Sequence, residues 1–105
     1  MTAEGVPAYV EIGDSVIYQN LQGEVVILNM ARQEYYGLND VGAAMWKMLL
    51  DQCDVEAVAD RLTAEYEAEP ETVRSDLSSL VQQLLSAGLL KKAQNRPEKS
   101  ISLVI

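Results

Sequence analysis

The chain has 105 residues, and its 16 acidic and 8 basic side chains give a formal net charge of -8 at pH 7. With 49% hydrophobic and 23% charged residues it has the composition of one globular domain, which excludes a disordered chain and a disulfide scaffold. The absence of histidine and the single cysteine exclude the common catalytic triads, zinc sites and thiolate clusters. We therefore expect no metal and no cofactor. The negative charge also argues against nucleic acid and anionic membranes as partners.

The N-terminal region lacks the features of a targeting segment. No basic residue precedes Arg32, and no apolar run approaches the length of a membrane span. These features predict a soluble, cytoplasmic protein. We expect Cys53 to be a small apolar core residue, because free cysteines are most often buried.

The first part of the chain has the pattern of β-strands. Residues 15–18 and 24–28 are β-branched runs, separated by residues 20–23 with turn composition, and they predict a hairpin. Residues 34–38 read as a third strand. We therefore expect a three-stranded antiparallel sheet over residues 15–38.

The central strand is apolar on both faces. Val26 and Leu28 fall on one face, and Val25 and Ile27 fall on the other. We therefore expect something to cover part of each side of the sheet.

From residue 39 onward the apolar residues recur with a helical period. Asn39 or Asp40 is the expected N-cap of the first helix. Trp46 lies beside its apolar stripe and is expected in the core. The stripe of this helix is expected to contain Val41, Met45, Met48, Leu49 and Leu50.

Two more helices complete a helical part over residues 39–90. Asp54 is expected to cap a helix over residues 55–66. Pro70 suits the first turn of a third helix, which Gly88 ends. The expected apolar stripes are Val55, Val58, Ala59, Leu62 and Tyr66 in the second helix, and Val73, Leu77, Leu80, Val81, Leu84 and Leu85 in the third.

Residues 91–105 are expected to form a tail, in which a polar loop over residues 91–100 precedes a terminal strand, Ile101–Ile105. Two arrangements are open for this strand. It pairs with Leu89 and Leu90 as a wing, or it takes the edge beside residues 34–38 in its own or a neighbouring molecule. In the second arrangement it competes with a ligand at that edge and supports a homodimer.

These elements together compose an α+β, winged helix-turn-helix-like fold in one domain over residues 1–105. That fold often binds DNA. Between Asp51 and Asp76, however, nine acidic residues stand against Arg61 and Arg74, so this surface neutralises phosphates poorly. No nucleotide-binding, nucleophile-elbow or metal-ligand motif occurs, and we expect no enzyme.

The junction between the third strand and the first helix carries a family resemblance. Residues 33–46 read QEYYGLNDVGAAMW, with a strand that ends in Leu38-Asn39 before a helix with the small residues Gly42, Ala43 and Ala44. This junction, followed by residues 57–66, resembles the PqqD-like family over most of the chain, from about Val16 to Leu90. Its members are the precursor-peptide recognition elements of ribosomally made, modified peptides.

Within that family, residues 69–77 and 84–90 look most like the stand-alone leader-binding proteins of lasso peptide pathways. The alternative is a chaperone for the pyrroloquinoline quinone (PQQ) precursor. Those chaperones more often have a glycine near the end of the first helix, where this chain has residues 51–54, DQCD.

The resemblance implies that a leader peptide adds as a strand beside the third strand and lies against the third helix. The protein would be a non-catalytic adaptor that presents the precursor to a maturation protease and a cyclase. A winged-helix DNA-binding regulator and a structural dimer module are the rival functions. The expected leader-binding residues are Glu34, Tyr35, Tyr36 and Leu38 on the strand, and Arg74, Leu77, Ser78 and Val81 on the helix.

Several of these residues also suit a purely structural role. Tyr35 and Tyr36 fit ordinary strand packing, because aromatic residues are common in strands whatever their function. Leu77 is expected in the core in either case. Arg74 fits a solvated helix charge as well as a recogniser of leader carboxylates or carbonyls.

Overall fold

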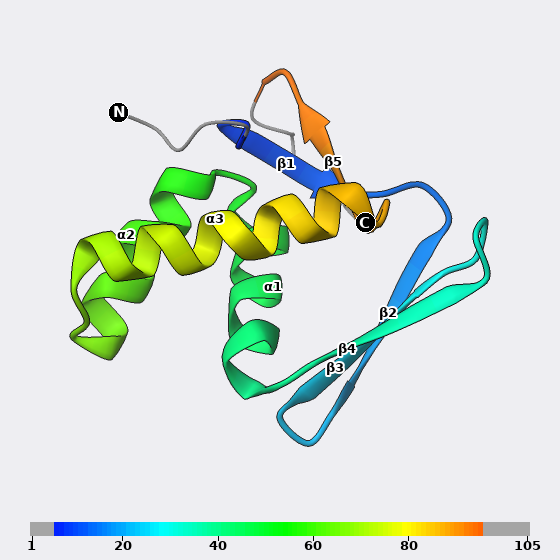
Figure 1. Ribbon diagram of the computed structural model, residues 1–105, viewed down its shortest axis with the longest axis horizontal. Helices are drawn as coiled ribbons and strands as arrows, with labels where there is room; N and C mark the ends of the chain where they lie inside the picture. Colours follow the sequence, from blue (N-terminus) through cyan, green and yellow to red (C-terminus); the bar gives the residue numbers. More distant parts are fainter. Residues whose placement is uncertain (1–5, 96–105) are drawn as a thin grey trace, which may run out of the picture.

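The computed structural model describes residues 6–95, and the expected three-stranded meander is present (Figure 1). Its strands are β2 (Val16–Leu21), β3 (Glu24–Asn29) and β4 (Glu34–Leu38), which pair antiparallel in the order β2-β3-β4. Because β3 is central, β2 and β4 each have one edge that no strand of the meander occupies.

The turn between β2 and β3 is tighter than the expected four residues. Leu21 pairs with Glu24, and only Gln22 and Gly23 connect the strands, with φ angles of 50° and 89°. Positive φ at both central positions is the signature of a type I′ turn, whose twist matches that of the flanking strands. The strand β2 therefore extends to Leu21.

The three expected helices follow the meander. Asn39 caps the first, because its side chain accepts a hydrogen bond from the Gly42 N–H at 3.0 Å. Asp54 caps the second by accepting from the Ala57 N–H at 3.1 Å. Gly88, with φ 76°, ends the third helix as expected. The helices are α1 (Asp40–Gln52), α2 (Val55–Tyr66) and α3 (Pro70–Ser86).

The core lies between the helices and the inner face of the meander. Trp46 on α1 is fully buried, and the ring of Tyr18 on β2 meets it edge-on with centroids 5.5 Å apart. Ile27, at the centre of β3, is buried on the same side. Cys53 is also buried, as expected. The helix α1 is thus the element on which the sheet rests.

Two expected core residues are exposed in the structure. Val41 is 50% exposed because it lies in the first turn of α1, beyond the edge of the buried stripe. Tyr66 is 53% exposed because it is the last residue of α2, at the end of the helix and of its packed stripe. Within residues 6–95, the expectation that something covers part of each side of the meander is met on the inner face alone. On the outer face, Val26 and Leu28 are half-buried and no described element packs over them.

A second, two-stranded sheet was not expected from the sequence. The strands β1 (Tyr9–Ile12) and β5 (Leu90–Ala93) pair antiparallel, with Tyr9 opposite Ala93. Residues 91–93 are therefore strand rather than tail. The strand β5 does not show the alternating apolar pattern of a strand, because the exposed Lys91 and Lys92 lie together between the buried Leu90 and Ala93. The expected terminal strand over residues 101–105 lies outside the described residues.

Across residues 6–95, none of the helices has the length and apolar composition that a membrane span needs.

Candidate functional site

The free edge of β4 offers backbone hydrogen-bonding groups. In an antiparallel ladder, hydrogen-bonded pairs alternate with non-bonded pairs, starting from the bonded pair that closes a two-residue turn. Counted along β3 from that turn, Ile27 forms a bonded pair with Tyr36, so the backbone of Tyr36 faces β3. The N–H and C=O groups of Tyr35 and Gly37 consequently point away from the sheet. An added strand would bond to these groups.

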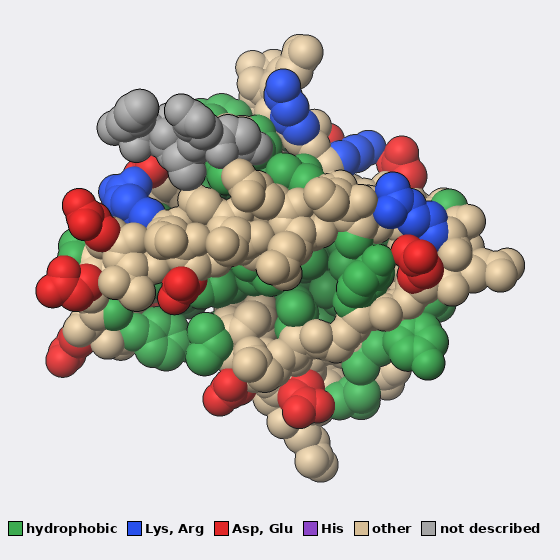
Figure 2. Space-filling view, viewed as in Figure 1, with side chains coloured by type: hydrophobic (Ala, Val, Ile, Leu, Met, Phe, Trp, Pro, Cys, Tyr) green, Lys and Arg blue, Asp and Glu red, His purple; other side chains and the backbone are tan. Residues whose placement is uncertain are grey.

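A groove runs beside this edge, between β4 and the C-terminal half of α3 (Figure 2). Its volume is about 730 Å³. Hydrophobic and polar side chains both line the groove, and most of the polar ones are uncharged. The groove is lined by Arg32, Glu34, Tyr36, Gly37 and Leu38 on the side of the meander, and by Ser79, Leu80, Gln82, Gln83, Leu84, Ser86, Ala87 and Leu89 on the side of α3.

A polar clamp joins the two walls at one end of the groove. The Asn29 side-chain amide donates to the Ala87 carbonyl at 3.1 Å, and the Arg32 guanidinium donates to the Ser86 carbonyl at 3.1 Å. Asn29 also accepts a hydrogen bond from the Arg32 backbone N–H. The clamp therefore ties the end of β3 to the last turn of α3, where carbonyl groups lack helical partners. Gly88 permits this approach, because a Cβ there would lie 2.8 Å from the Asn29 amide nitrogen.

Tyr36 and Glu34 interact along the inner face of β4. The Tyr36 hydroxyl donates to the Glu34 carboxylate at 3.0 Å. This hydrogen bond, followed by slight burial and the negative charge of Glu34, raises the pKa of Tyr36 above its ordinary value of 10.0. The pair presents an aromatic ring and a carboxylate to the groove.

The structure separates the expected strand residues into two groups. Glu34, Tyr36 and Leu38 line the groove. Tyr35 points to the opposite face of the sheet, where its side chain is 75% exposed. Its backbone remains on the free edge beside the groove, so Tyr35 offers an added strand its main-chain groups and no side chain in the groove.

The expected helix residues do not reach β4. Leu77 and Val81 are 1% and 0% exposed, so they lie in the core. Arg74 and Ser78 line a different pocket of about 430 Å³, between α3, the start of α2 and the segment Val6–Ala8. These positions follow from helical geometry, since they flank the buried stripe on the side that faces α2.

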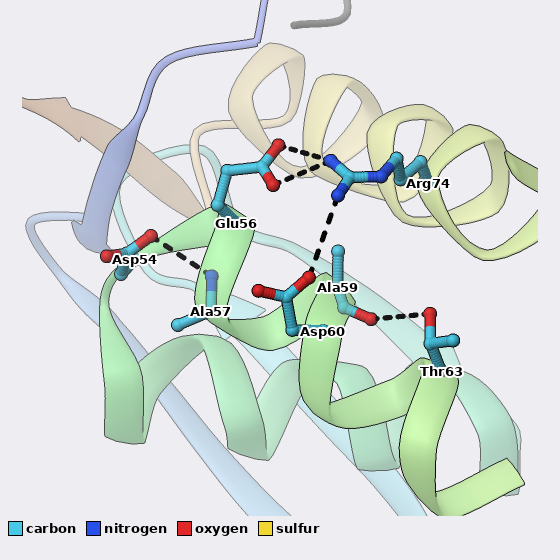
Figure 3. A network of polar contacts seen from close by, with 7 residues as sticks. All are labelled: Asp54, Glu56, Ala57, Ala59, Asp60, Thr63 and Arg74. Carbon is cyan, nitrogen blue, oxygen red and sulfur yellow. Dashed lines mark hydrogen bonds and ion pairs between the residues drawn. The ribbon is translucent and has the colours of Figure 1, made fainter. Parts of the chain in front are cut away.

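Arg74 is held against α2 rather than offered to a ligand (Figure 3). Its guanidinium donates to the Glu56 carboxylate at 2.6 Å and lies 3.6 Å from a carboxylate oxygen of Asp60. The hydrogen bond to Glu56, with the charges of Glu56 and Asp60, raises the pKa of Arg74. The group is half-exposed, so the ion pairs add little to stability.

Sequence reasoning missed the other flank of α3 and the clamp. Leu80 is half-buried on that flank and Gln83 is exposed one turn away, so both face the groove. The helical period defines the buried stripe but not which flank faces the sheet. Asn29 is the one buried polar residue in the described chain, and no local pattern marks it. In residues 6–95 no three acidic or cysteine side chains gather as a metal site would need.

The sequence and the fold are those of a known class of protein. Residues 24–90 match the family model of coenzyme PQQ synthesis protein D (PqqD), and the chain belongs to this family. The match begins at β3 and ends at the first residue of β5, so it contains β4, α3 and the groove between them.

Two solved structures are similar to this chain over most of its length. One is described as TbiB1 in complex with the TbiA(beta) leader peptide, with 30% identity, a TM-score of 0.75, and coverage of 81% of this chain and 99% of that one. The other is lasso peptide synthetase B1 complexed with the leader peptide, with 30% identity, a TM-score of 0.72, and coverage of 79% and 98%. No curated protein matches the sequence.

Proposed function

We propose that this protein binds the leader of a ribosomally made precursor peptide, which adds as a strand beside β4 and lies in the groove against α3. The observation that carries the proposal is the free edge of β4 beside a groove of about 730 Å³, which is lined by both polar and hydrophobic side chains. An extended peptide bonds its backbone to Tyr35 and Gly37 and places alternate side chains toward Tyr36, Leu38 and Leu80. Similarity to two proteins described in complex with leader peptides supports this role.

The edge of β2 is the rival position for an added strand, since it is also unpaired within the meander. The groove favours β4, because α3 stands beside that edge and supplies a second wall. Main-chain hydrogen bonds alone give little discrimination between sequences, whereas pockets for alternate side chains do. A specific peptide is therefore expected at β4.

The proposed role is that of a non-catalytic adaptor in the cytoplasm. Holding the leader keeps the rest of the precursor near the enzymes that modify it, a protease and a cyclase in a lasso peptide pathway. Tethering raises the effective concentration of a substrate into the millimolar range for short linkers. The adaptor thus accelerates maturation without contributing a reacting group.

A PQQ precursor chaperone is the second candidate, and the family model that matches the chain favours it. The similarity to lasso peptide B1 proteins favours the lasso pathway. A DNA-binding role is disfavoured, because Arg74 is engaged by Glu56 and Asp60 on a largely acidic surface.

The test is a titration of the protein into fluorescein-labelled leader peptides of a lasso precursor and a PQQ precursor. We expect one of them to bind one-to-one with a Kd between about nanomolar and tens of micromolar, as strand-addition interfaces allow. A duplex of upstream DNA serves as the control for the regulator. If neither peptide changes the anisotropy at high micromolar protein, the adaptor role is wrong.

A further inference from the structure

The two walls of the leader groove belong to different packed parts of the fold (Figure 1). The meander packs on α1, whereas α3 packs along α2 and β5. Within residues 6–95, the backbone of α3 makes few close approaches to β3 or β4. The width of the groove therefore depends on side-chain contacts that cross from one wall to the other.

Asn29 makes the more buried of the two hydrogen bonds that cross between the walls. Its side chain is 4% exposed, and its amide nitrogen donates to the Ala87 carbonyl at 3.1 Å. Its amide oxygen accepts from the Arg32 backbone N–H at 3.1 Å, which fixes the orientation of the amide. The other crossing bond, from the Arg32 guanidinium to the Ser86 carbonyl, is exposed. Water replaces an exposed hydrogen bond at little cost, so the Asn29 bond is the stronger constraint.

Two glycines let the backbones come close enough for this hydrogen bond. A Cβ at Gly88 would lie 2.8 Å from the Asn29 amide nitrogen. A Cβ at Gly13, between β1 and β2, would collide with the Gly88 carbonyl oxygen. The Gly13 N–H also donates to the Leu89 carbonyl at 3.0 Å. The segment that follows α3 is therefore packed against both Gly13 and Asn29, which fixes its position relative to the end of β3.

Asn29 connects residues of both walls without lining the groove itself. Its partner in the ladder, Glu34, lines the wall on the side of β4, and its hydrogen-bond acceptor, Ala87, lines the wall on the side of α3. The side chain of Asn29 lies outside the groove. A leader strand in the groove would therefore not touch Asn29, and any effect of this residue on leader binding has to pass through the two walls.

We propose that Asn29 is a positioning residue of the leader site, whose hydrogen bond to Ala87 holds β4 and α3 at the separation that one added strand requires. This inference rests on the proposed function. An added strand has to reach the backbone of β4 and place its side chains against α3 at the same time. A groove whose walls are already held at that separation does not have to be ordered on binding, and this preorganisation increases affinity.

The test variant is Asn29→Ser. The serine hydroxyl still accepts from the Arg32 N–H, as serine does in turns of this kind, but it is too short to reach the Ala87 carbonyl. The matched control, Val58→Ala, shortens a fully buried side chain of α2 that does not line the groove. Both changes are expected to lower the melting temperature. Anisotropy measures the affinity for the leader that binds the wild type, at a temperature well below the lower melting point, where both variants are folded.

We expect Asn29→Ser to weaken leader binding by about tenfold and Val58→Ala to leave it within about twofold of the wild type. A purely structural role for Asn29 predicts instead that both folded variants bind the leader as the wild type does. That result, or an equal loss of affinity in both variants, would overturn the inference. Asn29→Thr, which has a higher β propensity, replaces the serine variant if the latter does not fold. Failure of the proposed function is a different result, in which the wild type binds no leader.

Discussion

Replacing Gly37 by proline tests the strand-addition site at a single backbone group. The N–H of Gly37 points away from β3, and proline is tolerated on an edge strand where that group faces outward. Space is also available, because a Cβ added at Gly37 would meet no atom within 4 Å. The φ angle of Gly37 is not positive, so its backbone conformation does not require glycine. The variant should fold as the wild type does.

The expected loss of leader affinity follows from the removed donor. A backbone hydrogen bond contributes about 0.5–1.5 kcal/mol net, and the leader carbonyl left without a partner costs about 1–3 kcal/mol when buried. The proline ring also blocks close approach along the edge. We expect a total of about 2–3 kcal/mol, which weakens binding by roughly 30- to 150-fold.

The matched control is Gly37→Ala, which adds a Cβ but retains the N–H. Isothermal titration calorimetry with the leader should give an affinity within about threefold of the wild type for the alanine variant. Thermal unfolding of the free proteins shows whether each sheet is intact. The reasoning is refuted if Gly37→Pro is folded and binds normally, or if alanine is as harmful as proline.

Three further predictions concern other expected residues. Arg74→Ala should leave leader affinity within about twofold in an anisotropy titration, because Arg74 is paired with α2 and lies outside the groove. A larger loss would place the flank of α3 that carries Arg74 in the site. Val81→Asp should lower the melting temperature sharply, since an unpaired charge at a fully buried position costs about 3 kcal/mol or more; a wild-type melt would contradict the burial. In an alkaline titration followed by phenolate absorbance, the wild-type minus Tyr36→Phe difference should titrate above pH 10.0, and Glu34→Gln should lower that midpoint. The Tyr36 pKa is raised, so the hydrogen bond's contribution is complete below the unfolded value and is lost as pH rises through the folded one.

Local chemistry was sufficient to predict most elements. The side chains of Asn39 and Asp54 cap their helices by accepting a hydrogen bond from an N–H group three residues further along the chain. The glycines in the turn and at the end of α3 are needed for the positive φ angles of their own backbone. Strand and helix periods likewise depend on neighbours in the chain. For that reason the meander, the three helices and the strand-to-helix junction that carries the family resemblance were all predictable from the sequence.

Only the tertiary structure decided how these elements meet. The pairing of β1 with β5 joins the two ends of the described chain, and the Asn29 bond to Ala87 spans 58 residues. The helical period of α3 left both flanks of its buried stripe available, and packing against α2 and β5 turned Leu80 toward β4 and Arg74 toward Glu56. A periodic pattern reports which residues are buried, whereas the direction in which an element turns depends on contacts between segments far apart in sequence.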